Sequence, residues 1–345
     1  MTDTIYYPHE VPPGQGEVIE VKPGILWMRL PLPLRLDHVN AYALDDGDSW
    51  TLVDTGFDTK KTREVWHELL QGPLSGKPVK RLFVTHYHPD HIGLAGWFQT
   101  HFGVELITTR TSWLTARMLV LDEQPKATPE TLLFYKRAGV VESLYEKKKQ
   151  ERPFNFCDVV APMPQGYTRV QEGESITLGG RDWIIRMGNG HAAEHATLWS
   201  GDIVLGGDQL LPSISPNLGV YATEPAANPV LEWLEACNRL KKYALSNQLV
   251  LPGHKLPFRG LPLRLEQLID NHVGALKRLL SHLELPHTAH ECFLPLFKRE
   301  IGEGEYGLAL GETVAHLNYL YSADKVTRTL RSDGAYEYQS KITSQ

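Results

Sequence analysis

The sequence predicts an α/β protein: a large sheet-based domain with a helical insert, followed by a small, mostly helical C-terminal domain. The first observation is a set of short apolar runs that each end at a glycine or a polar residue, as buried strands do. The second is that segments with apolar residues at helical spacing lie between these runs. The third is a long amphipathic segment after residue 260. We expect the larger domain at residues 1–284, its insert at about 110–165, and the smaller domain at 285–345.

The first part of the chain predicts a strand meander and then alternating helices and strands. Strands are expected at residues 25–30, 39–44, 50–53, 82–84 and 104–108. The sequence Asp45-Asp46-Gly47-Asp48 favours a hairpin turn between the second and third strands. Helices are expected at residues 58–70 and 93–102, and Asp58 or Thr59 is expected to cap the first of them.

Residues 110–165 interrupt the sheet pattern and predict two or three helices inserted between strands. Near the mouth of a site, such an insert would form a lid or a substrate pocket. Its aromatic residues either line an apolar site or pack the insert onto the core, and the sequence leaves both open: Phe134, Tyr135, Tyr145, Phe154 and Phe156. The basic run at 147–149 is expected to be a solvated helix face.

The most distinctive motif is Thr85-His86-Tyr87-His88-Pro89-Asp90-His91, directly after the apolar run at 82–84. Imidazole nitrogen and carboxylate oxygen are ligands for Zn²⁺ and related divalent ions. The motif therefore predicts a metal site on the loop past the strand. We expect His86 and His88 to bind one ion, and Asp90 and His91 to point toward another.

Other predicted strands end in the same kind of residue. The pairs that follow them are Asp54-Thr55, Gly190-His191, Gly207-Asp208 and Gly253-His254. This repeated pattern places scattered ligand residues at one sheet edge, where an active site would form.

Together these motifs resemble the metallo-β-lactamase superfamily over roughly residues 20–275. The resemblance implies an αββα sandwich with two metal ions between its facing sheets. The ligands that it implies are His86, His88 and His191 for one ion, Asp90, His91 and His254 for the other, and Asp208 as a bridge. A full set with a bridging aspartate is similar to glyoxalase II-like thioesterases, lactonases and phosphodiesterase nucleases rather than to antibiotic-degrading lactamases.

Two neighbouring metal ions imply a hydrolytic reaction. At about 3.5–4 Å apart they can lower the pKa of a shared water, so that metal-bound hydroxide attacks a carbonyl or phosphoryl centre. Asp90 is expected to act as ligand and is a candidate proton acceptor, and Asp54 is expected to orient a ligand histidine. His195 is either a supporting or acid group or a satisfied histidine under the site. Tyr221 is a candidate for stabilising an oxyanion.

The leading hypothesis is a metal-dependent hydrolase with two divalent ions, acting on a thioester, ester or lactone. Zinc is the expected metal, with iron or manganese as alternatives. The alternatives are a phosphodiesterase or ribonuclease of the same fold, a non-catalytic metabolite-binding member, and a mononuclear iron dioxygenase. The intact second ligand set, with His91 and His254, argues against the dioxygenase.

The C-terminal pattern resembles the small winged-helix-like domain of some relatives. A helix is expected at 261–283, then apolar patterns at 312–321 and 326–330 before the turn at Asp333-Gly334. Since no basic recognition helix is visible, we expect this domain to pack against the catalytic domain or a second copy, as in a homodimer.

Composition limits the partners. The net charge of −6 and pI near 6.2 give no general attraction for nucleic acid. The start of the sequence lacks signal-peptide features, and no apolar run approaches the roughly 20 residues of a membrane span. Three widely spaced cysteines, outside every ligand motif, favour reduced thiols and a cytoplasmic location. The expected partner is a small-molecule substrate with an apolar portion.

Overall fold

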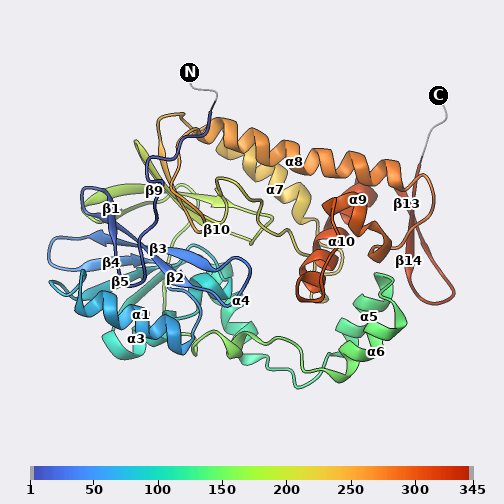
Figure 1. Cartoon of the computed structure of the whole chain (residues 1–345), viewed down its shortest axis with the longest axis horizontal. Coiled ribbons are helices and arrows are strands. Elements are labelled where there is room, and N and C mark those ends of the chain that lie inside the picture. The colour runs from blue at the N-terminus through green and yellow to red at the C-terminus, as the bar shows by residue number, and fades with distance from the viewer. Residues whose placement is uncertain (1–3, 342–345) are drawn as a thin grey trace. The chain divides into compact units, whose positions relative to one another are not determined.

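The computed structural model describes residues 4–341 and divides into two compact units (Figure 1). The first unit consists of the chain up to Glu123, Phe154–Pro216 and Arg239–Leu265. The second consists of Gln124–Pro153, Asn217–Asn238 and the chain from Glu266 onward. The insert predicted at 110–165 thus contributes to both units, and the predicted domain boundary at residue 284 stays a prediction.

Two sheets form the first unit. The larger has the order β1-β2-β3-β4-β5-β6-β7, antiparallel from β1 to β4 and parallel from β4 to β7. Its strands are β1 (Ile19–Lys22), β2 (Ile25–Pro31), β3 (His38–Asp45), β4 (Trp50–Val53), β5 (Val79–Phe83), β6 (Glu105–Thr108) and β7 (Thr168–Arg169). The meander and the later strands predicted for this part of the chain are therefore confirmed.

The smaller sheet has the order β12-β11-β10-β9-β8, and its only parallel pair among the described strands is β11 with β12. Its strands are β8 (Ser175–Leu178), β9 (Arg181–Gly188), β10 (His195–Ser200), β11 (Ile203–Gly207) and β12 (Leu249–Pro252). Apolar side chains of both sheets form one core: among them are Trp27, Phe83, Ile107, Trp183, Ile185, Leu205 and Leu251. Since one core is shared by facing sheets, the predicted sandwich is confirmed.

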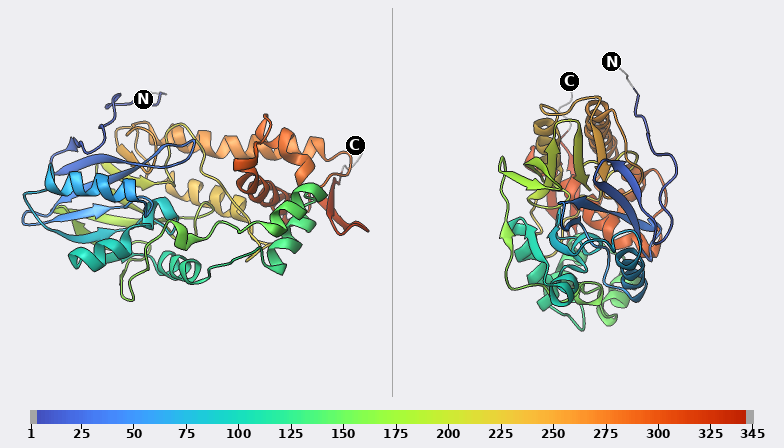
Figure 2. Two further views of the ribbon diagram at one scale, coloured as in Figure 1. Left: turned by 60° about the horizontal axis from the view of Figure 1, so that its bottom comes forward. Right: turned by 90° about the vertical axis from the view of Figure 1, so that its left-hand side faces the viewer.

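Helices cover the outer face of the larger sheet. They are α1 (Lys60–Gln71), α2 (Pro89–Ile92), α3 (Ala95–Phe102) and α4 (Arg110–Leu121), with the short helix η1 (Phe156–Asp158). Thr59 caps α1 by accepting a hydrogen bond from Thr62 N, whereas Asp58 pairs with Arg63. Figure 2 shows α1 and α3 on the same side of this sheet, where the Trp66 and Phe98 rings pack edge to face at 4.9 Å.

The second unit is mostly helical, and the predicted helical C-terminal region lies within it. Its elements are α5 (Pro129–Arg137), α6 (Glu142–Gln150), most of α7 (Pro229–Leu240) and α8 (Leu261–His282), η2 (His290–Cys292), α9 (Phe293–Phe297), η3 (Glu303–Glu305), α10 (Tyr306–Ser322), β13 (Val326–Leu330) and β14 (Tyr336–Ser340). The strands β13 and β14 form an antiparallel hairpin around the predicted Asp-Gly turn, where Gly334 has φ +91°. Helix α10 begins six residues before the predicted 312–321, and much of it is buried.

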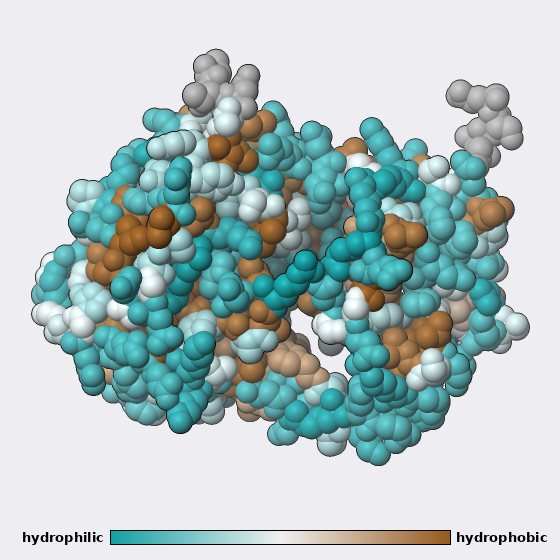
Figure 3. Space-filling model, in the orientation of Figure 1, coloured by the Kyte–Doolittle hydropathy of each residue, from teal (hydrophilic) through white to brown (hydrophobic). Residues whose placement is uncertain are grey.

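Within residues 4–341, no helix combines the length and the apolar composition that a bilayer span needs. The face drawn in Figure 3 is mainly hydrophilic, with hydrophobic patches between the polar regions.

Candidate metal centre

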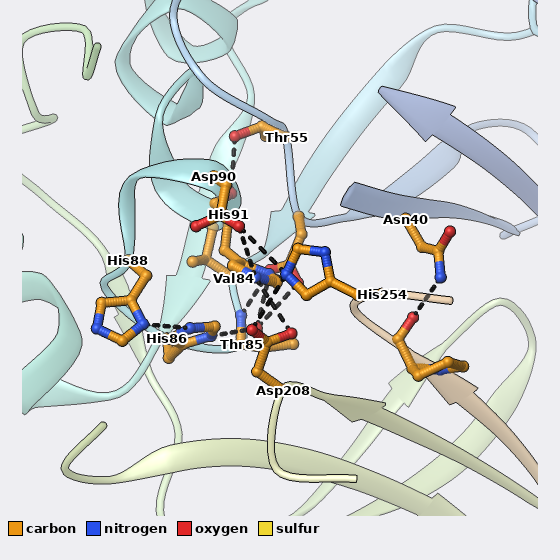
Figure 4. A network of polar contacts seen from close by, with 12 residues as sticks. Asn40, Thr55, Val84, Thr85, His86, His88, Asp90, His91, Asp208 and His254 are labelled. Atoms are coloured by element: carbon orange, nitrogen blue, oxygen red, sulfur yellow. Dashed lines mark hydrogen bonds and ion pairs between the residues drawn. The ribbon is translucent and has the colours of Figure 1, made fainter. Parts of the chain in front are cut away.

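The predicted ligand residues converge at one edge of the first unit (Figure 4). The larger sheet supplies His86, His88, Asp90 and His91 from the loop after β5 and from α2, and the smaller sheet supplies His191, Asp208 and His254 from the ends of β9, β11 and β12. Residues more than a hundred positions apart in the sequence thus meet because both sheets end at the same place.

The first group contains three imidazoles. His86 Nε2 lies 3.0 Å from His88 Nδ1, which lies 2.9 Å from His191 Nε2. Ligand atoms bound to one zinc ion at about 2.0–2.1 Å have similar mutual separations. The three nitrogens therefore fit a single cation.

The second group contains Asp90, His91 and His254. Asp90 Oδ2 lies 3.3 Å from His254 Nε2 and 3.6 Å from His91 Nε2. Asp208 lies between the groups: its Oδ2 is 3.5 Å from His191 Nε2 and 3.2 Å from His254 Nε2, and its Oδ1 is 3.4 Å from His91 Nε2. One carboxylate thus reaches ligand atoms of both groups, which is the position that a bridge requires.

Two observations show that these residues fit divalent cations. His91 Nε2 and Asp208 Oδ1 are buried and have no hydrogen-bond partner among the described residues. Buried polar atoms are normally satisfied, so orphaned atoms facing one another indicate a missing partner. The donor set of imidazole nitrogen and carboxylate oxygen is the one that zinc and related ions use.

Electrostatics in the centre favour cations as well. Burial, reinforced by neighbouring imidazoles, holds the pKa of His86 well below its ordinary value, so this ring is neutral. Burial opposes charge on Asp90 too, but His91 and His254 lower its pKa to about 2. Burial likewise opposes charge on His254, yet Asp208 and Asp90 raise its pKa to about 10. The carboxylates therefore hold positive charge in the centre, a role that bound cations would take over.

Asp54 lies behind His91. It accepts hydrogen bonds from Thr85 N at 2.9 Å and Thr85 Oγ1 at 2.9 Å, and its Oδ2 is 2.7 Å from His91 Nδ1. His91 donates through Nδ1 to this carboxylate, so its Nε2 faces the other ligands. Asp54 itself adopts φ +61°, a left-handed conformation that Asp tolerates better than most residues.

His195 lies beneath the centre and is fully buried. Its Nε2 accepts a hydrogen bond from Asp208 N at 3.0 Å, and its ring stacks on His86 at 4.4 Å. Burial lowers the pKa of His195 to about 3, so the ring is neutral. This geometry suits a residue that supports Asp208 and His86 better than an acid that reaches a substrate.

Sequence reasoning missed the residues that hold the His254 loop. His254 Nδ1 donates to the carbonyl oxygen of His38 at 2.8 Å, and Asn40 Nδ2 donates to the carbonyl oxygens of Pro252 and Lys255 at 2.9 and 3.0 Å. Asn40 is labelled beside this loop in Figure 4. A signal existed, because an asparagine in the otherwise apolar run 39–44 needs a buried partner.

Tyr221 is not part of this cluster. It belongs to the second unit, and its side chain is 47 % exposed. Its role with an oxyanion stays a prediction.

Comparisons with known proteins agree with this geometry. Residues 34–254 match the family model of the metallo-beta-lactamase superfamily, and residues 276–341 match that of the metallo-beta-lactamase-like, C-terminal domain. The probable metallo-hydrolase YqjP of Bacillus subtilis (strain 168) is 25% identical over 321 residues, which are 90% of this chain and 97% of the relative.

Two solved structures are similar over nearly their whole length. A beta-lactamase domain protein from Burkholderia ambifaria is 33% identical, with a TM-score of 0.89, over 97% of this chain and 98% of that one. A metallo-beta-lactamase family protein from Thermus thermophilus is 29% identical, with a TM-score of 0.77, over 93% and 100% of the two chains.

Proposed function

The chain belongs to the metallo-beta-lactamase superfamily and is a metal-dependent hydrolase, and on that basis we propose that it uses two divalent ions, expected to be zinc, to hydrolyse a thioester, ester or lactone. The observation that carries the proposal is Asp208, whose two carboxylate oxygens lie 3.2–3.5 Å from ligand nitrogens of both groups. A carboxylate that reaches ligand nitrogens of both groups can serve as a ligand shared by two ions.

In this proposal one ion would be held by His86, His88 and His191, and the other by Asp90, His91 and His254, with Asp208 shared. When bound, the ions supply an activated water at neutral pH and polarise the substrate carbonyl. The protein's own part is to fix the ligands.

We also propose Asp90 as the group that transfers protons. Its side chain is 18% exposed, against 3% for His254. A carboxylate that is both ligand and partly accessible can take a proton from the attacking water and pass it to the leaving group.

An aromatic series beside the centre supports a substrate with an apolar portion. The Tyr87 ring packs edge to face on ligand His88 at 4.6 Å, Phe156 stacks on Tyr87 at 6.5 Å, and Phe154 packs edge to face on Phe156 at 6.1 Å. The series leads from a metal ligand to Phe154, which is 63% exposed. We propose that it carries the acyl or aromatic part of the substrate. No matching observation supports Phe134, Tyr135 or Tyr145, which belong to the second unit.

The other expectations stay predictions. We propose a cytoplasmic location, because the three cysteines, all in the described part of the chain, form no disulfide with one another. The net charge of −6 continues to disfavour nucleic acid as a partner. A homodimer is still a hypothesis.

The test combines elemental analysis with hydrolysis assays on an acyl thioester, a lactone and bis-(p-nitrophenyl) phosphate. We expect two metal ions per chain and turnover of a carbonyl substrate, both reduced in Asp208→Ala. Asp202→Ala is the control, since Asp202 pairs with Lys22 in the same unit. Cleavage of the phosphodiester alone, or full metal content in Asp208→Ala, would contradict the proposal.

The apolar portion is tested separately with thioesters of increasing acyl length. We expect Phe154→Ala to raise KM for long acyl groups and to leave the shortest one unchanged. Phe102→Ala removes another exposed phenylalanine of the first unit and serves as the control. Equal effects on KM for short and long substrates would contradict a role of the aromatic series in binding the acyl group.

A further inference from the structure

A second cluster of metal-ligand residues lies wholly within the second unit. Glu312 and His316 are one turn apart on α10, and His272 is on α8. One ligand atom of each residue lies within 4.8 Å of the others. Residues at positions i and i+4 share one face of a helix, so Glu312 and His316 present their ligand atoms together.

Hydrogen bonds orient the imidazole of His316. Its Nδ1 donates to the carbonyl oxygen of Glu312 at 2.8 Å, which leaves the lone pair on Nε2. This Nε2 lies 3.2 Å from His272 Nδ1, close to the 2.9–3.0 Å between imidazole nitrogens in the catalytic centre. With zinc–nitrogen bonds of about 2.1 Å, that separation corresponds to an angle of about 100° at the ion, which tetrahedral coordination accepts.

The charges of the cluster lack a cation. Glu312 Oε2 accepts a hydrogen bond from Asn217 Nδ2 at 2.8 Å, but among the described residues no lysine, arginine or histidine forms an ion pair with it. The carboxylate therefore has no counter-charge among the side chains that the structure describes.

His272 is deeply buried, and one of its two ring nitrogens has no partner that the structure describes. This residue is 1% exposed, and its Nε2 is buried without a hydrogen-bond partner in the described part of the chain. This Nε2 is not the atom that faces His316, so it stays without a described partner whether Nδ1 donates to His316 or binds a cation. The neighbouring Trp233 Nε1 is orphaned too, with its ring 6.1 Å from that of His272.

We propose that His272, Glu312 and His316 bind a further divalent cation, with Zn²⁺ as the expected ion. The ion joins α8 to α10, and water completes its coordination from the side of Glu312, which is not fully buried. Asn217 and the carbonyl oxygen of Glu312 orient the ligands from outside. The site is independent of the catalytic proposal.

The first test counts metal in a chain whose catalytic centre is disabled by His88→Ala, Asp208→Ala and His254→Ala. After gel filtration in zinc-free buffer we expect one zinc ion per chain, and none when His316→Gln is added. His290→Gln is the control, because His290 is a half-buried histidine of the same unit bonded to Tyr306. The proposal would be overturned if the triple variant bound no zinc, or if it kept its zinc after His316→Gln was added.

A second test does not depend on how well the multiple variant folds. His316→Cys in the otherwise unchanged chain is loaded with Co²⁺, and thiolate-to-cobalt charge-transfer absorption is recorded. We expect this band in His316→Cys and not in Thr313→Cys, which places a buried thiol on the same helix away from the cluster. Absence of the band, or equal bands in both variants, would show that residue 316 does not ligate.

Discussion

Replacing Asp54 with asparagine is expected to weaken the ion held by His91 while leaving the fold nearly intact. Asp54 accepts from Thr85 N and Thr85 Oγ1, both at 2.9 Å, and lies 2.7 Å from His91 Nδ1. An asparagine carbonyl can keep the contacts with Thr85, but its amide group then faces His91 Nδ1. His91 would respond by accepting at Nδ1 and carrying its proton on Nε2, the atom that must bind metal.

The size of both effects follows from the hydrogen bonds that Asp54 makes and from the typical strength of such bonds. A hydrogen bond to a charged group contributes about 1.5–3 kcal/mol, and Asp54→Asn exchanges one such bond for a neutral one, so the free energy of unfolding should fall by about 1–2 kcal/mol. Asn also tolerates the φ of +61°. Asp54→Ala orphans three buried donors and should cost about 3–6 kcal/mol. Affinity for the ion at His91 should fall about 10–100-fold in Asp54→Asn.

The assay is zinc titration against a chromophoric chelator, with urea unfolding of the metal-free proteins so that metal binding does not enter the stability. Asp202→Asn is the matched control, since Asp202 forms an exposed ion pair with Lys22 in the same unit. Unchanged zinc affinity in a folded Asp54→Asn variant would refute the tautomer argument.

Three further predictions concern other parts of the molecule. In Gly253→Ala the new Cβ would overlap Asp208 Oδ1, so metal content and turnover should fall at least about 10-fold, whereas Gly76→Ala meets nothing within 4 Å and should retain both. In metal-free protein, Glu312 has a pKa of about 7 against an ordinary 4.5. As pH rises, this carboxyl loses its proton at a lower pH in the unfolded chain than in the folded one. The free energy of unfolding should therefore fall by up to about 3 kcal/mol between about pH 4.5 and 7. Urea unfolding measured across this pH range should show the decrease in the unchanged protein and not in Glu312→Gln. The same decrease in both proteins would contradict the prediction. Trp66→Ala removes a fully buried ring that packs on Phe98 and donates to Thr55 O, and it should lower the free energy of unfolding by about 3–5 kcal/mol; a loss below about 1 kcal/mol would contradict this packing.

The residues predicted as ligands lie close together in the structure because each follows a local pattern. An apolar run ends, a glycine or tight loop follows, and a histidine or aspartate stands next to it, as at Asp208 and His254. Parallel and facing strands then bring these ends together without any further information in the sequence. The meander and α1 follow from equally local signals, such as the hairpin turn at 45–48 and the cap at Thr59.

The parts that sequence reasoning missed depend on contacts between distant residues. His254 is oriented by the carbonyl oxygen of His38, and a backbone carbonyl carries no sequence signature. The start of α10 was hidden by Gly302, Gly304 and Gly307, because glycine disfavours helices and masks a helix that tertiary packing stabilises. The sharing of the insert between two units is likewise set by packing rather than by local pattern.

The contact between His38 and His254 also explains why the centre needs both sheets. His254 follows β12 of the smaller sheet, but its ring is held by β3 of the larger one, where Asn40 also binds the carbonyl oxygens on either side of it. In the proposed assignment each ion takes ligands from both sheets, since His191 joins His86 and His88, and His254 joins Asp90 and His91. Any change in sheet spacing would therefore move ligands of both ions relative to one another. The shared apolar core between the sheets, which fixes that spacing, is thus part of what positions the catalytic groups.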